Sequence, residues 1–200
     1  MVERVRLCAL GAIFGLLAVA QVIEFESGGL HYQTLTRRRV TVMFAQMPAH
    51  VHEFSIVQVA VSNGSKGPYT IRPEDFRFVR ADGTVVHAIP ARDVVNILLE
   101  KGSRNDVIRL VSTYESGLYG IQRMLSTNGY EQRRQAALAE VQSTKVKAAA
   151  AASAIALVQI KLMAGQSTDG AVFFPHEGKA LSGGRLVVTT NTDTFEFKTE

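Results

Sequence analysis

The segment that decides the fold runs from Phe54 to Asn63 and reads FSIVQVAVSN. If it is a strand, Phe54, Ile56, Gln58, Ala60 and Ser62 lie on one face, and Ser55, Val57, Val59 and Val61 lie on the other. Apolar side chains therefore occur on both faces. That pattern is typical of a strand with neighbours on either side, so we predict a central strand.

Further strand patterns lie on both sides of this segment. An Asp82-Gly83 pair separates two apolar-rich runs, which indicates a hairpin, and Asn191-Thr192-Asp193 is turn chemistry near the C-terminus. About seven short strands separated by turns favour an antiparallel β-sandwich. The predicted strand segments are Val40–Phe44, Phe54–Ser62, Thr70–Pro73, Phe76–Val79, Thr84–Ala88, Ala171–Phe174, Arg185–Thr190 and Thr194–Lys198.

Between residues 91 and 164 the periodicity becomes helical. Val94–Leu99 and Val107–Val111 carry apolar residues at helical spacing, and Tyr130–Met163 contains neither Gly nor Pro. The last segment has high helix propensity, which predicts one long helix or two nearly collinear ones. Because strands flank these helices, we predict a single domain, residues 21–200, that is mainly β with a helical insertion at about residues 91–164.

Three motifs carry a resemblance to a known class of domain. They are Phe54–Asn63, the Ile71–Phe76 segment, which reads IRPEDF, and the Ala81-Asp82-Gly83 turn; Gly170–Phe174 adds a glycine-led strand. Together they resemble the immunoglobulin-like domains of uncharacterised secreted bacterial proteins. The resemblance implies an immunoglobulin-like antiparallel β-sandwich and an exported location, and it implies no catalytic residues. The long helical insertion departs from the usual pattern.

The N-terminus has the form of an export signal. Arg4 and Arg6 precede an almost purely apolar run, Leu7–Ala20, which ends in the small-x-small sequence Ala18-Val19-Ala20. We predict a signal peptide at residues 1–20 and a periplasmic or extracellular protein; an uncleaved membrane anchor is the alternative. Cys8, the only cysteine, lies near the start of the apolar run, so we expect neither a lipoprotein nor a disulfide.

The charge distribution argues against a nucleic-acid partner. The formal net charge is only +4. The cluster Arg37–Arg39 is short, and no aromatic side chains alternate with it as a single-strand stacking platform requires. We interpret it as solvated.

Candidate chemical motifs are few. His50 and His52 beside Glu53 resemble part of a zinc site, but a closed site needs ligands from elsewhere. The serines at positions 112, 116 and 126 lack the Gly-x-Ser-x-Gly context of a nucleophile elbow. The Glu74-Asp75 pair fits a turn or a helix cap. The Gly183-Gly184 pair precedes a strand, whereas a phosphate-binding loop precedes a helix. We therefore predict no catalytic, metal or cofactor site.

The uncharged segment Ala148–Ile160 is the most unusual feature of the chain. It is short and alanine-rich for a membrane span. It is expected either to pack against the rest of the protein, to meet a partner, or to lie on a membrane surface. As a candidate partner-binding or self-association strip at helical spacing we single out Leu138, Val141, Ala148, Ala152, Ile155 and Leu162.

Two functional hypotheses remain. The first is a non-enzymatic exported protein that binds a protein partner, or associates with the envelope, through the helical insertion. The second is a hydrolase-type enzyme whose site lies where the insertion meets the sandwich. The absence of catalytic motifs favours the first.

Overall fold

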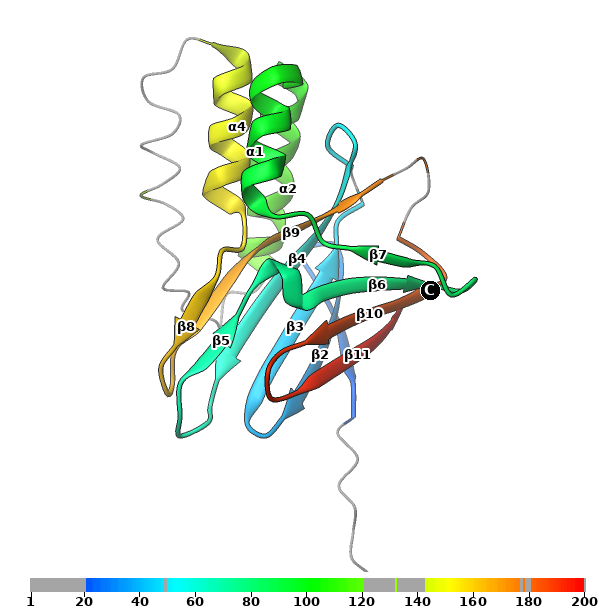
Figure 1. Cartoon of the computed structure of the whole chain (residues 1–200), viewed down its shortest axis with the longest axis vertical. Coiled ribbons are helices and arrows are strands. Elements are labelled where there is room, and N and C mark those ends of the chain that lie inside the picture. The colour runs from blue at the N-terminus through cyan, green and yellow to red at the C-terminus, as the bar shows by residue number, and fades with distance from the viewer. Residues whose placement is uncertain are drawn as a thin grey trace, which may run out of the picture.

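The computed structural model describes residues 21–48, 50–120, 132, 143–176, 178 and 181–199. This part of the chain is mainly β, with antiparallel sheets and three helices (Figure 1). Residues 1–20, on which the signal-peptide prediction and Cys8 fall, lie outside the described residues.

The larger sheet has five strands in the order β1-β2-β3-β4-β9, and all neighbours are antiparallel. Within it β4 lies between β3 and β9, where Val59 pairs with Phe44 and Ile56 pairs with Phe173. The prediction of a central strand at Phe54–Ser62 is therefore confirmed. The strands are β1 (Ile23–Ser27), β2 (Leu30–Arg37), β3 (Val40–Gln46), β4 (Phe54–Asn63) and β9 (Ser167–Pro175).

A four-stranded sheet has the order β11-β10-β6-β7, and β5 and β8 form a separate two-stranded pair. The Asp82-Gly83 hairpin is confirmed, because β6 and β7 are antiparallel and Gly83 takes a φ of 86° that suits glycine. The remaining strands are β5 (Tyr69–Ile71), β6 (Phe76–Arg80), β7 (Val85–His87), β8 (Ile160–Leu162), β10 (Gly184–Thr189) and β11 (Thr194–Thr199).

The alternation along β4 divides the interior into two cores. Phe54, Ile56 and Ala60 belong to a core that also contains the buried residues of the helices. Val57 and Val59 belong to a second core that the larger sheet shares with the four-stranded sheet. The two-sided apolar pattern of this strand thus has a physical cause: one face is covered by helices and the other by a second sheet.

Three helices form the layer over the first core: α1 (Ala91–Lys101), α2 (Arg104–Gly120) and α4 (Thr144–Ile155). In Figure 1 they stand side by side, and α4 packs against both α1 and α2. Small residues permit this close approach. A Cβ atom at Gly102 would lie 2.8 Å from Cβ of Ala148, so the turn between α1 and α2 lies against the alanine-rich face of α4.

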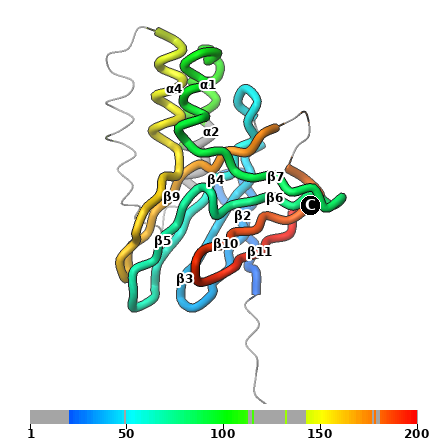
Figure 2. Tube along the Cα trace, viewed as in Figure 1, coloured from blue at the N-terminus to red at the C-terminus, as the bar shows by residue number. Residues whose placement is uncertain are grey.

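The long helix predicted to reach Met163 is wrong at its C-terminal end. The helix ends at Ile155, and the chain continues in extended form to β8, which pairs with β5 (Figure 2). Leu157 donates its N–H to Ala171, and a Cβ atom at Gly170 would lie 2.7 Å from the Leu157 backbone. Tertiary hydrogen bonding over small residues of β9 therefore overrides the helix propensity of this segment.

The strand count was also underestimated. The described residues contain eleven strands rather than seven or eight, and β1, β2 and β8 were not predicted. Strands before and after the helices nevertheless pair directly with each other, β4 with β9 and β6 with β10. The helices are therefore inserted in the sequence between strands that are hydrogen-bonded neighbours in each of the two larger sheets.

Candidate functional site

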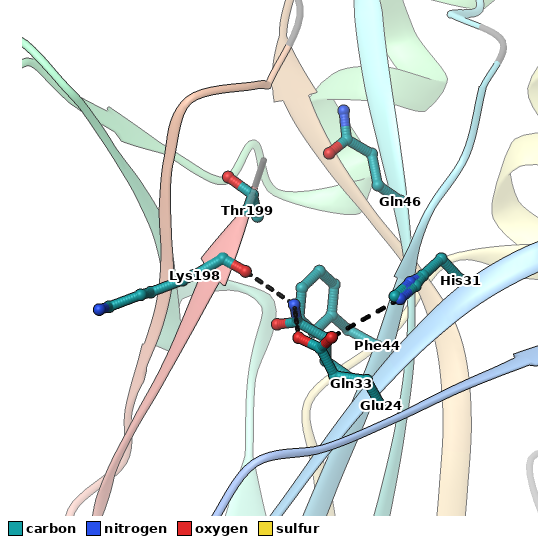
Figure 3. Close-up of a pocket in the computed structure, with 7 residues that line it drawn as sticks. All are labelled: Glu24, His31, Gln33, Phe44, Gln46, Lys198 and Thr199. Carbon is teal, nitrogen blue, oxygen red and sulfur yellow. Dashed lines mark hydrogen bonds and ion pairs between the residues drawn. The ribbon is translucent and has the colours of Figure 1, made fainter.

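The candidate site is a cleft of about 600 Å³ between the first three strands and β11 (Figure 3). We call it the β11 cleft. It is lined by Glu24 of β1, His31 and Gln33 of β2, Phe44 and Gln46 of β3, and Lys198 and Thr199 of β11.

Strand register explains how these side chains converge. Glu24 pairs with Gln33 across β1 and β2, and Gln33 pairs with Phe44 across β2 and β3. Directly paired residues project from the same face of a sheet, so these three form a row across adjacent strands. His31 and Gln46 lie two residues along their strands from this row and so share its face. The larger sheet thus supplies most of the cleft lining.

Gln33 joins the two sides of the cleft. Its Nε2 donates to Oε1 of Glu24 at 2.7 Å and to the backbone carbonyl of Lys198 at 2.7 Å (Figure 3). Both amide hydrogens are then used, and one of them ties the edge strand β11 to the larger sheet. The Oε1 of Gln33 is shielded from solvent and has no hydrogen-bond partner within the described residues. The cleft therefore holds a buried acceptor that lacks a donor.

The cleft begins where the second core ends. The ring of Phe44 contacts the ring of Phe197 edge to face, with centroids 4.9 Å apart. Beyond this pair the lining becomes polar, and the imidazole Nε2 of His31 lies 3.8 Å from Oε2 of Glu24. An aromatic base beneath convergent carboxylate, imidazole and amide groups suits a ligand that has both an apolar part and hydrogen-bond donors.

The residues of the predicted contact strip lie elsewhere. Ala148, Ala152, Ile155 and Leu162 are all buried, each with at most 1% of its surface exposed. The first three belong to the core beneath the helices, and Leu162 lies on β8 in the core between the sheets. These side chains do not form an exposed surface in this structure, which agrees with the packing interpretation of Ala148–Ile160. Leu138 and Val141 lie outside the described residues.

The two histidines of the His50-x-His52 motif lie in different surroundings. His50 stacks on His176, with ring centroids 4.5 Å apart and an interplanar angle of 10°, while His52 is exposed at a turn with φ of 53°. His176 also lies 2.9 Å from Ser55 through its Nδ1. Within the described residues no group of three or more His, Cys, Asp or Glu side chains is arranged to hold a metal ion.

Other flagged residues have structural roles. Arg38 and Arg39 occupy the tight turn between β2 and β3 with positive φ, and their side chains are exposed. Asp75 accepts a hydrogen bond from the backbone N–H of Arg72 at 2.9 Å, as a cap does, and burial raises the pKa of its carboxyl. Burial also raises the pKa of Tyr32, to about 12, in the core beneath the helices. Ser126 lies outside the described residues.

Sequence reasoning missed the β11 cleft because it requires pairing information. A signal was present in β2, where His31 and Gln33 share a face with the buried Leu35. Polar residues that continue a core-facing series indicate the place where a core opens to solvent. That signal becomes interpretable only when the strand itself has been recognised.

Comparison with known proteins adds little. No family model matches the chain, and no curated protein matches it in sequence. One solved structure is similar to it, the crystal structure of the yjhA protein from Bacillus subtilis, with 10% identity and a TM-score of 0.36 over 89% of this chain and 96% of that one. At that score the likeness carries no functional argument.

A membrane-spanning helix must be long and apolar. Among the described residues, no helix combines the length and the apolar character that crossing a bilayer requires.

Proposed function

We propose that this protein is a non-enzymatic, exported binding module that holds its partner in the β11 cleft. The observation that carries the proposal is the Gln33 Oε1 acceptor, which is buried beside the cleft without a donor in the described part of the chain. Buried polar groups are normally hydrogen-bonded, and leaving one unsatisfied costs about 1–3 kcal/mol. A partner that supplies an N–H or O–H donor would remove that cost on binding.

Two further features support this choice of surface. The volume of about 600 Å³ lies within the usual range for ligand pockets. Of the strip that the sequence suggested as the binding surface, Ala148, Ala152 and Ile155 are buried within the helical layer and Leu162 is buried on β8. The β11 cleft, in contrast, offers accessible convergent polar groups over an aromatic base.

The fold is part of the same proposal. Two antiparallel sheets share a core. The segments that carry the resemblance lie on β4 and β9, in the connection from the end of β5 to the start of β6, and in the turn between β6 and β7. We regard the protein as a variant of the immunoglobulin-like sandwich to which a helical layer has been added. Such a scaffold would place the cleft at one open end of the sandwich, a position where domains of this architecture can present binding residues.

The exported location is tested at the N-terminus. We expect the mature protein to begin at or within a few residues of Gln21, because Ala18-Val19-Ala20 provides the small side chains that signal peptidase accepts. The measurement is intact-mass analysis of the protein recovered from the envelope or medium of its host. Recovery of the chain with an intact Met1 start would contradict cleavage and would support the retained anchor.

Partner binding is tested by Gln33→Met, which keeps the side-chain length and removes the acceptor and both donors. We expect about 5- to 150-fold weaker binding of the component that the wild-type protein retains from envelope extract, because a lost buried hydrogen bond costs about 1–3 kcal/mol. Retained components are identified by mass spectrometry, and their affinities are then measured by titration. Thermal melting verifies that the variant is folded.

The matched control is Gln159→Met, which makes the same chemical change at an exposed glutamine outside the cleft. It should bind the partner as the wild type does. Equal binding by Gln33→Met and the wild type would contradict the role of the cleft.

The enzymatic alternative is supported by the 2.9 Å contact between Ser55 Oγ and His176 Nδ1. Ester hydrolysis by the wild-type protein that is lost in Ser55→Ala would contradict the non-enzymatic proposal.

A further inference from the structure

Two imidazoles meet at the opposite end of β4 from its Asn63 turn. His50 precedes β4, and His176 follows β9 directly. Because β4 and β9 are antiparallel with Phe54 paired to Pro175, the start of one strand lies beside the end of the other. This register brings the two rings into a near-parallel stack with centroids 4.5 Å apart. The pair lies on residues that the β11 cleft does not use.

His176 is held in a defined orientation. Its backbone N–H donates to the carbonyl of Glu53 at 2.7 Å, and its Nδ1 lies 2.9 Å from Oγ of Ser55, which is itself only 7% exposed. When the Nδ1–H donates a hydrogen bond to this hydroxyl, the imidazole carries its free lone pair on Nε2. No hydrogen bond to that Nε2 occurs among the described residues. The contact with Ser55 thus orients the ring and is compatible with the tautomer that binds a metal ion through Nε2.

His50 provides a second, more exposed imidazole. Its side chain is exposed, whereas its backbone carbonyl accepts a hydrogen bond from Nη1 of Arg109 on α2 at 3.3 Å. The backbone is therefore tied to the helical layer while the ring retains freedom to turn about its side-chain torsions. Two ligand nitrogens in a tetrahedral zinc site, with bonds of about 2.0–2.1 Å, lie roughly 3.3 Å apart. A metal ion lies in the plane of each imidazole that binds it, so the exposed His50 ring must turn out of the stack for both rings to reach one ion.

We propose that His50 and His176 form an open, two-imidazole site for a divalent transition-metal ion, with Ser55 as the positioning residue of His176. Neutral imidazole is the ligand type that Zn²⁺, Cu²⁺ and Ni²⁺ prefer, whereas Mg²⁺ prefers oxygen. A ligating histidine normally donates its other N–H to a nearby acceptor, which is the role that the Ser55 hydroxyl fills. Water completes the coordination, since the described residues offer no group of three ligating side chains.

The test is calorimetric titration of the tag-free protein with ZnCl₂. We expect one Zn²⁺ per chain, with at least tenfold weaker binding in His176→Ala and in His50→Ala. Ser55→Ala should weaken binding about tenfold although it removes no ligand, because loss of an orienting partner typically reduces metal affinity by about 10–100-fold. The matched control is His87→Ala, an exposed histidine on β7, which should bind Zn²⁺ as the wild type does.

A control metal ion and a folding check show whether any Zn²⁺ binding is specific to this site. MgCl₂ should give no saturable binding, and far-ultraviolet circular dichroism should show each variant folded before metal is added. Absence of Zn²⁺ binding by the wild type, or equal binding by His176→Ala, would overturn the site. Equal loss in His87→Ala would overturn it as well, because binding would then be a general property of surface histidines.

Discussion

Replacement of Phe173 by alanine is expected to lower the free energy of unfolding by about 3–5 kcal/mol, the usual cost of removing a fully buried phenylalanine side chain. Phe173 is 2% exposed and lies in the core between the larger sheet and the helices. Its ring meets that of Phe54 edge to face, with centroids 6.1 Å apart. The substitution therefore leaves a cavity at the contact between sheet and helices. Total stabilities of about 5–15 kcal/mol make such a loss large.

Urea denaturation followed by circular dichroism measures this change. The matched control is Phe25→Ala on the edge strand β1, where the ring is 39% exposed and stacks on Tyr32. It removes the same atoms from a position that water already reaches, so a clearly smaller loss is expected. Equal unfolding midpoints for Phe173→Ala and the wild type would contradict the packing of β9 beneath the helices.

The elements that could be predicted from the sequence are those whose pattern is local. Val59 and Phe173 each lie in a segment that was predicted as a strand, and both are buried. The two residues nevertheless lie in different cores, because Val59 on β4 faces the four-stranded sheet, whereas Phe173 on β9 faces the helices. Alternation within a strand identifies its buried positions, but it does not identify which layer covers each face.

The missed elements depend on contacts that are distant in sequence. The strand β1 contains two glutamates among five residues, so no apolar run marks it. The strand β8 follows a sequence of high helix propensity and is extended because it pairs with β5, while Leu157 just before it donates to Ala171 of β9. The β11 cleft requires β1, β2, β3 and β11 to be placed together. The stack of His50 on His176 likewise follows only from the pairing of β4 with β9.

Replacement of Ile155 by aspartate is expected to destabilise the protein by at least about 3–5 kcal/mol. Ile155 is 1% exposed at the last residue of α4. An uncompensated buried charge alone has a cost of this size, and a carboxylate at a helix C-terminus also opposes the helix dipole. Loss of the isoleucine packing adds to both effects. The measurement is the urea midpoint, with thermal melting as a second readout.

The matched control is Val146→Asp on the same helix. Val146 is 38% exposed near the N-terminus of α4, where a negative charge is favoured by the helix dipole, so stability should change by less than about 1 kcal/mol. This variant also places a charge on the exposed surface of the helical layer. If partner binding persists in Val146→Asp and is lost in Gln33→Met, the partner binds at the β11 cleft. If the folded Val146→Asp loses the partner while Gln33→Met retains it, the helical layer is the binding surface and the cleft proposal is contradicted.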